Sequence, residues 1–154
     1  MPKHLLIVYH SKTGNTEALA QAAYAGATDD LIDAVDVRLL RARDAGPGDL
    51  LWADALLLGT PENFGYMSGA MKDFFDRTFY EVEGRIAALP YAIFISAGND
   101  GSGAVRAIQR IGNGYPFSQV QEPLITRDGI DAADLARCQE LGMTLAAGLD
   151  TGVF

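Results

Sequence analysis

The sequence predicts an α/β fold in which helices cover both faces of one parallel sheet. Short strand-like runs alternate along the chain with segments whose apolar residues recur at helical spacing, the pattern of β-α-β units. Several of the strand-like runs are continuously apolar, as central strands buried on both faces are. The 154 residues have the size of one compact domain, so we expect a single domain spanning 1–154.

Five strands are expected. They are short and mostly apolar, and they are Leu5–Tyr9, Val35–Leu40, Ala55–Leu58, Tyr91–Ala97 and Val120–Ile125. The first, third and fourth contain uninterrupted apolar residues and should be central. The second alternates apolar residues with Asp36 and Arg38, which predicts a strand at an edge of the sheet.

The segments between these strands carry the apolar stripes of helices. Such stripes run through Met71–Phe79, Val105–Ile111 and Leu135–Leu145, and each should cover the sheet. Cys138 lies within the last stripe and should be a small core or interface residue. Arg41–Ala55 contains Gly46, Pro47 and Gly48, which predict a loop and a short turn of helix instead of a full crossover helix.

Charge and hydropathy exclude several classes of function. The net charge of −8 repels phosphate backbones and argues against nucleic acid as the main partner. No apolar stretch approaches the ~20 residues that a membrane span needs, and the first residues do not begin a signal peptide. We therefore expect a cytoplasmic protein without a membrane span, in which the acidity either maintains solubility or steers a positively charged partner.

The residues between the first strand and the first helix predict an anion site. The sequence S-K-T-G-N-T follows Leu5–Tyr9, and a helix should begin near Gly14 to Glu17. Backbone amides of the first helical turn point into such a loop, and the helix dipole favours negative charge there. The candidate phosphate ligands are Ser11, Lys12, Thr13, Gly14, Asn15 and Thr16. Because Ser and Thr are also common helix caps, this loop alone leaves a purely structural role open.

Two known nucleotide motifs are missing from this position. The sequence has no G-x-x-x-x-G-K-[ST], and no G-x-G-x-x-G follows the first strand. The loop therefore suits a terminal phosphomonoester that is held without a metal.

A second motif, GTPENFGYMSGAMKDFFDRT, begins at Gly59 and follows the third expected strand. Together with S-K-T-G-N-T it resembles the flavodoxin-like FMN proteins. The closest resemblance is to the branch of tryptophan-repressor-binding-protein-type quinone reductases and NAD(P)H:FMN oxidoreductases. The resemblance covers nearly the whole chain. It implies a flavodoxin-like open five-stranded parallel sheet in the order 2-1-3-4-5, with FMN at the carboxyl ends of strands 1 and 3, a rule for which flavodoxin is itself a standard example.

The resemblance assigns three loops to FMN. The loop from Ser11 to Thr16 would hold the phosphate. A second loop would lie along the isoalloxazine ring: Pro61, Glu62, Asn63, Phe64, Gly65 and Tyr66. A third would close the other edge of the ring: Ala97, Gly98, Asn99, Asp100 and Gly101.

Individual residues of the second and third loops suit these roles. Phe64 and Tyr66 can cover an apolar ring, although ordinary packing under a loop is the alternative. Asn63 and Asn99 can bond the pyrimidine edge of the ring. Glu62 departs from the polar pair usual in the quinone-reductase branch, and its carboxylate would disfavour an anionic reduced flavin if it faced the ring.

Two functions remain open. The first is an FMN-dependent oxidoreductase in which NAD(P)H reduces the flavin and the flavin reduces a quinone or similar acceptor. The flavin would carry the chemistry, with no catalytic side chain and no metal. His10 and Asp100 are the nearest candidates for tuning protonation, although a polar cap at a strand end is the favoured role for His10. The alternative is an acidic carrier that passes single electrons between protein partners. A homodimer is expected to cover the open flavin face.

Overall fold

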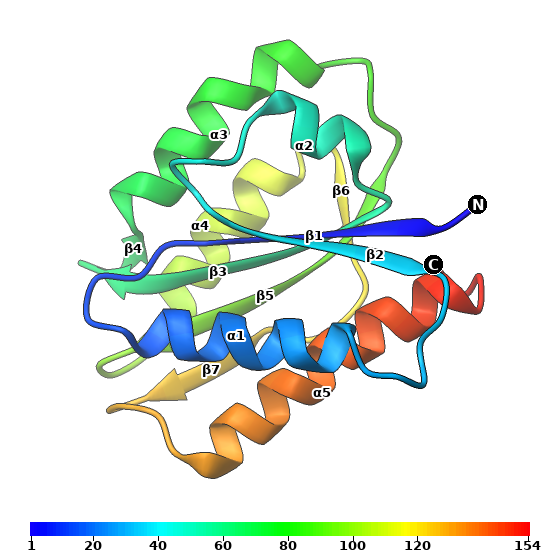
Figure 1. The fold of residues 1–154 in the computed structure, drawn as a ribbon. Helices are drawn as coiled ribbons and strands as arrows, with labels where there is room; N and C mark the ends of the chain where they lie inside the picture. Colours follow the sequence, from blue (N-terminus) through cyan, green and yellow to red (C-terminus); the bar gives the residue numbers. More distant parts are fainter.

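A parallel sheet with the order β2-β1-β3-β5-β6 forms the centre of the molecule, as Figure 1 shows in the computed structural model of residues 1–154. Its strands are β1 (Lys3–Tyr9), β2 (Val35–Arg41), β3 (Ala55–Asn63), β5 (Leu89–Ala97), β6 (Phe117–Gln119) and β7 (Leu124–Arg127). A two-residue strand, β4 (Tyr66–Met67), pairs antiparallel with the end of β3. The expected flavodoxin-like order of the parallel strands is confirmed.

The fifth expected strand has different bounds from those predicted. The sequence predicts one strand over Val120–Ile125, but two short segments, β6 and β7, pair with opposite ends of β5. Pro123 lies between them and lacks the N–H that a continuous ladder needs. Val120, Leu124 and Ile125 are all apolar, so hydrophobicity alone suggested one continuous strand across Pro123.

Helices cover both faces of the sheet. On one face lie α1 (Asn15–Ala27) and α5 (Ala132–Asp150), and on the other lie α2 (Pro47–Trp52), α3 (Gly69–Val82) and α4 (Ser102–Gly112). The short α2 confirms that the segment after β2 holds only a brief helix. None of the helices combines the length and apolarity that crossing a membrane requires.

The core consists of two apolar layers, one on each face of the sheet. Alternate residues of the central strands point into each layer: Leu5 and Ile7 join the cluster under α1 and α5, while Leu6 and Val8 join the cluster under α3 and α4. Cys138 is fully buried in the first of these clusters, so its expected core position is confirmed. The strand β2 pairs only with β1, which confirms its place at the edge, and partly buried and exposed residues alternate over Val35–Leu39.

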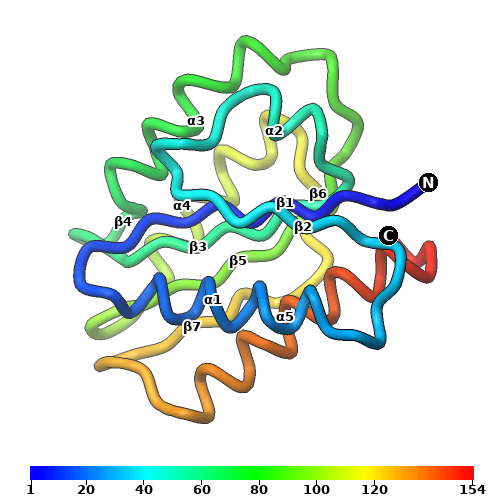
Figure 2. Tube along the Cα trace, viewed as in Figure 1, coloured from blue at the N-terminus to red at the C-terminus, as the bar shows by residue number.

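The chain termini and the loops singled out in the sequence lie at opposite ends of the sheet. Figure 2 shows that both termini lie at the same side of the molecule, away from the loops that follow β1, β3 and β5. These loops emerge together at the carboxyl ends of adjacent parallel strands. The topology therefore gathers the residues singled out in the sequence at one edge.

Candidate functional site

A cavity of about 210 Å³ lies where the loops after β1, β3 and β5 meet. Nine of its lining residues belong to the three loops predicted from the sequence, and the tenth is Ser96. The full set is Lys12, Thr13, Asn15, Thr16, Pro61, Glu62, Asn63, Ser96, Ala97 and Gly98. The other predicted residues lie outside this lining: Ser11, Gly14, Phe64, Gly65, Tyr66, Asn99, Asp100 and Gly101.

The first loop presents the start of α1 to the cavity. Gly14 precedes the helix with φ 106°, a left-handed conformation that favours glycine, and its N–H donates to Ser11 Oγ at 3.1 Å. No side chain caps α1, so the first-turn amides keep their capacity to bind an anion. This arrangement disfavours the alternative in which the hydroxyls of the loop serve only as helix caps. The exposed Thr13 and the half-buried Asn15 add side-chain donors at the cavity.

Thr16 joins the first loop to the end of β5. Its hydroxyl lies 2.7 Å from Ser96 Oγ, and both side chains are buried. This bond fixes the first turn of α1 against the sheet. Ser96 was missed from the sequence, although a hydroxyl at the end of an apolar strand, directly before Ala97 and Gly98, was an available signal.

Glu62 joins the second loop to the third. Its carboxylate accepts hydrogen bonds from the backbone N–H groups of Gly101 at 3.0 Å, Gly103 at 3.1 Å and Ala104 at 3.3 Å. The negative charge therefore lies at the N-terminus of α4, where the helix dipole stabilises it. Glu62 lines the cavity, but both oxygens of its carboxylate accept hydrogen bonds from backbone amides, which partly compensate its negative charge.

The second loop turns tightly beyond the cavity. Phe64 (φ 53°) and Gly65 (φ 72°) are both left-handed and join β3 to β4 in the geometry of a type I′ hairpin turn. Gly103 packs against this turn, because a Cβ on Gly103 would lie only 2.1 Å from the Gly65 carbonyl oxygen. Phe64 is fully exposed and Tyr66 is 42% exposed. Packing under a loop, the alternative considered for Phe64, is therefore wrong.

The third loop is held by contacts on its outer side. The Asp100 carboxylate accepts a hydrogen bond from Ser102 Oγ, and this bond holds the pKa of Asp100 below its usual value. The Asp100 carbonyl accepts from Arg127 Nε at 3.0 Å. Asp100 is thus occupied outside the cavity.

His10 extends the pairing of β1 beyond its last strand residue, since its backbone N–H donates to the Gly59 carbonyl at 3.1 Å. Burial lowers the pKa of its imidazole, and the nearby Arg41 and Arg43 lower it further. His10 lines a second, smaller cavity beside the phosphate loop. Its neutral form is therefore favoured at neutral pH.

The donor set of the main cavity fits FMN. One end offers hydroxyls, an amide, the cation of Lys12 and an uncapped helix N-terminus, which suit a phosphomonoester. The other end offers Pro61, Asn63 and the backbone of Ala97 and Gly98, which suit the polar edge of a flat ring. The only carboxylate in the lining, that of Glu62, is already bonded to backbone amides.

Comparison with known proteins agrees with the fold and with the sequence motifs. A flavodoxin of Aquifex aeolicus is 36% identical over 99 residues, which cover 64% of this chain and 52% of the relative. An NAD(P)H dehydrogenase (quinone) of Acidithiobacillus ferrooxidans is 32% identical over 119 residues, 64% of this chain and 59% of the relative. The chain thus matches about half to three fifths of the length of these relatives.

The solved structure of an archaeal flavodoxin superposes with a TM-score of 0.80 at 24% identity and covers 95% of this chain and 98% of its own. At that identity the likeness shows the fold alone. The sequence model of the family described as Flavodoxin matches residues 7–120, which include all three loops and most of the sheet. The chain therefore belongs to the flavodoxin family.

Proposed function

We propose that this protein binds FMN in the 210 Å³ cavity and works as an FMN-dependent oxidoreductase that passes electrons from NAD(P)H to a quinone or similar acceptor. The observation that carries the proposal is the convergence of an uncapped α1 N-terminus, a hydroxyl-rich loop and two ring-edge loops on one cavity. Bound FMN would supply the redox chemistry, accepting two electrons as a hydride and passing both to the acceptor, together or one at a time.

The residues of the chain would bind and orient the cofactor. Thr13, Asn15 and Lys12 would hold the phosphate together with the first amides of α1. Pro61 would stiffen the loop along the ring, and Asn63 would bond its polar edge. Glu62 and Ser96 would support the site indirectly. Ser96 holds the first loop through Thr16, and Glu62 holds the third loop through Gly101.

The NAD(P)H and quinone parts of the proposal are supported by relatives. Those of Acidithiobacillus ferrooxidans and Paracoccus denitrificans, both described as NAD(P)H dehydrogenase (quinone), are each 32% identical over the matched residues. A free carboxylate at Glu62 would disfavour an anionic reduced flavin. Because the Glu62 carboxylate accepts hydrogen bonds from backbone amides of α4, its charge is partly compensated and is compatible with flavin reduction. A place in the tryptophan-repressor-binding-protein-type branch is part of the same proposal and rests on the second sequence motif.

The second candidate is a carrier of single electrons between proteins. The net charge of −8 favours it, because carriers of this kind dock through complementary charge. The flavodoxin of Aquifex aeolicus, 36% identical, supports it as well.

An anaerobic reduction of the FMN-loaded protein distinguishes the two candidates. NADH or NADPH is added stepwise and the visible spectrum is followed, with dithionite as a reference reductant. We expect a nicotinamide nucleotide to reduce the flavin in a single spectral transition and added quinone to reoxidise it. Reduction by dithionite alone, in two separate transitions, would favour the carrier. Failure to load FMN would contradict both.

A homodimer is also proposed. Phe64 is a fully exposed aromatic residue that directly follows Asn63 of the cavity lining, and Tyr66 is 42% exposed, so a second copy would cover apolar surface there. Sedimentation velocity should give the mass of two chains. Replacing Phe64 by Ser should shift the protein to one chain, and a wild-type protein that sediments as a monomer at micromolar concentration would contradict the dimer.

A further inference from the structure

A second cavity, of about 160 Å³, lies beside the phosphate loop at the carboxyl ends of β1 and β2. Its lining residues are His10, Ser11, Arg41, Ala42, Arg43 and Ala70. Ser11 lines this cavity and its neighbour Lys12 lines the proposed FMN cavity, so the two cavities flank the same loop. The proposed binding of FMN makes no use of His10, Arg41 or Arg43.

The charge of this cavity differs in sign from that of the whole chain. The chain has a net charge of −8, yet the charged residues that line the cavity are two arginines, and no carboxylate lines it. Arg41 is held by an ion pair with Glu17. Arg43 Nε lies 4.0 Å from Asp44 Oδ1, and both side chains are largely exposed. A surface pair of this kind is weak, so the Arg43 guanidinium remains available to another anion.

His10 lines the same cavity as Arg41 and Arg43. The charges that lower its pKa are those of Arg41 and Arg43, with burial as the larger cause. An anion bound in the cavity would relieve an unfavourable accumulation of positive charge.

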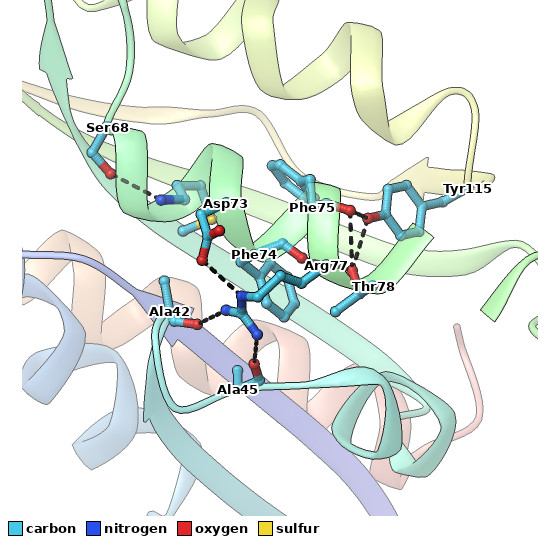
Figure 3. Close-up of polar contacts among 10 residues, drawn as sticks. Ala42, Ala45, Ser68, Asp73, Phe74, Phe75, Arg77, Thr78 and Tyr115 are labelled. Carbon is cyan, nitrogen blue, oxygen red and sulfur yellow. Dashed lines mark hydrogen bonds and ion pairs between the residues drawn. The ribbon is translucent and has the colours of Figure 1, made fainter. Parts of the chain in front are cut away.

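The turn that carries Arg43 is already fixed (Figure 3). Arg77 of α3 donates to the Ala42 carbonyl at 2.8 Å and to the Ala45 carbonyl at 3.0 Å, and Asp73 orients its guanidinium at 2.7 Å. Ala70 places the first turn of α3 at the same cavity, with the positive end of the helix dipole. A bound anion would therefore meet a rigid turn and would not bear the cost of ordering it.

We propose that this cavity binds the 2′-phosphate of NADPH, and that the protein therefore prefers NADPH to NADH as the electron donor. Guanidinium groups suit phosphate because they offer parallel N–H donors that match its oxygens. The cavity of about 160 Å³ has room for a phosphate group, and we assign it as a subsite for a terminal phosphate. The inference rests on the proposed function in so far as NADPH is the reductant of bound FMN.

The test uses 2′,5′-ADP, which carries the phosphate and no nicotinamide. The chain has two histidines, and they are separately observable by NMR. His10 lines the cavity, whereas His4 stacks on Trp52 with ring centroids 4.3 Å apart and serves as the internal control. In the FMN-loaded protein, 2′,5′-ADP should raise the pKa of His10, because a dianion stabilises the imidazolium, and should leave His4 unchanged.

Two variants make the test specific. Arg43→Gln should weaken the binding of 2′,5′-ADP about tenfold and raise the KM for NADPH by a similar factor, with little change for NADH. Arg110→Gln removes the same charge from an exposed position at the end of α4 and should change neither quantity. Inorganic phosphate is titrated in parallel. If inorganic phosphate moves His10 and 2′,5′-ADP does not, the cavity binds a free anion and the nucleotide assignment is overturned.

Failure of this inference is distinguishable from failure of the proposed function. A protein that loads FMN but shows no response of His10 to 2′,5′-ADP, or the same response in Arg43→Gln, overturns the subsite and leaves FMN binding intact. A protein that loads no FMN contradicts the proposed function. In that case the titration is repeated on the apoprotein, where dependence of the His10 response on Arg43 still decides whether the cavity binds the phosphate.

Discussion

Thr13 and Thr16 lie on the same loop but in different environments. Thr13 is exposed at the cavity, whereas Thr16 is buried and shares a hydrogen bond of 2.7 Å with Ser96. The first hydroxyl is free to bind a ligand, and the second holds α1 against β5. Similar residue types close together in sequence can therefore serve binding and folding separately.

Replacing these threonines should separate the two roles. Thr13→Ala should weaken FMN binding about tenfold, because one hydrogen bond worth ~1.4 kcal/mol is lost, and should leave the free energy of unfolding of the apoprotein unchanged. Thr16→Ala should lower the free energy of unfolding of the apoprotein by about 1–3 kcal/mol, because the hydroxyl of Ser96 loses its buried partner. Flavin fluorescence titration and urea unfolding measure the two quantities. Thr13→Ser should restore affinity, and equal affinities of wild type and Thr13→Ala would refute the phosphate assignment.

The single carboxylate of Glu62 accepts hydrogen bonds from three backbone amides at the N-terminus of α4. Glu62→Gln should lower the free energy of unfolding by about 1–2 kcal/mol, because a neutral amide interacts less with the helix dipole and offers a single oxygen acceptor. Glu122→Gln, at an exposed position, provides the matched control. Equal urea midpoints for the two variants would show that the link between the loops contributes nothing to stability.

Cys138 illustrates how burial sets reactivity. Burial raises the pKa of its thiol to about 12, well above the value of about 8.5 for a free thiol in the unfolded chain. Between these values deprotonation favours the unfolded state, so the free energy of unfolding should decrease as the pH rises above about 8.5, by at most ~1.4 kcal/mol per pH unit from this group. Cys138→Ala should reduce that slope.

Labelling of this thiol provides a second measurement. Because the folded thiol is neutral and inaccessible, a thiol reagent at pH 8 should label the wild type only after denaturant is added. Rapid labelling of the folded protein would be inconsistent with the burial of Cys138.

At the scale of elements, α1 and α5 are in backbone contact. A Cβ on Gly26 would lie 1.8 Å from the Gln139 carbonyl oxygen, and a Cβ on Gly142 would lie 2.0 Å from that of Ala23. Only glycine allows the two helices to approach this closely at either position. The small residues of these helices therefore fix the distance between them and the way that they cover β1 and β3.

Gly142→Ala tests this contact. Alanine has the higher helix propensity by ~1 kcal/mol, yet the clash should dominate and lower the free energy of unfolding by about 1–3 kcal/mol. Gly69→Ala is the control, because a Cβ at that helical position meets nothing within 4 Å. We expect the control to be neutral or slightly stabilising in thermal unfolding. A Gly142→Ala protein as stable as the wild type would mean that the helices separate at little cost.

At the scale of the whole molecule, the net charge of −8 should affect protein acceptors and small neutral acceptors differently. Electron transfer from the reduced protein to a basic protein such as cytochrome c should slow several-fold when salt is raised from 20 to 300 mM, because the Debye length falls below 10 Å. Transfer to an uncharged quinone should change little. Stopped-flow rates at both salt concentrations measure this, and equal salt dependence for both acceptors would exclude steering by charge.

The pattern of the sequence determined which parallel strands are central and which lies at the edge, whereas the order of the strands came from the resemblance to flavodoxin-like proteins. Continuous apolar runs predicted β1, β3 and β5 as central strands, alternation predicted β2 at the edge, and the polar loop after β1 predicted an anion site there. The resemblance added the loops after β3 and β5. These features depend on local periodicity and on the rule that parallel strands bring their carboxyl ends to one edge. Both can be read from a single chain.

Only the tertiary structure decided which groups in that site remain free. The hydroxyl of Thr16 is occupied by Ser96, the carboxylate of Glu62 is occupied by amides that begin α4, and the fifth strand is divided at Pro123. Arg43 is brought beside His10 because Arg77, more than thirty residues away, bonds the turn that carries it. Such pairings join residues far apart in sequence, and no local pattern specifies them because each depends on where the folded backbone places both partners.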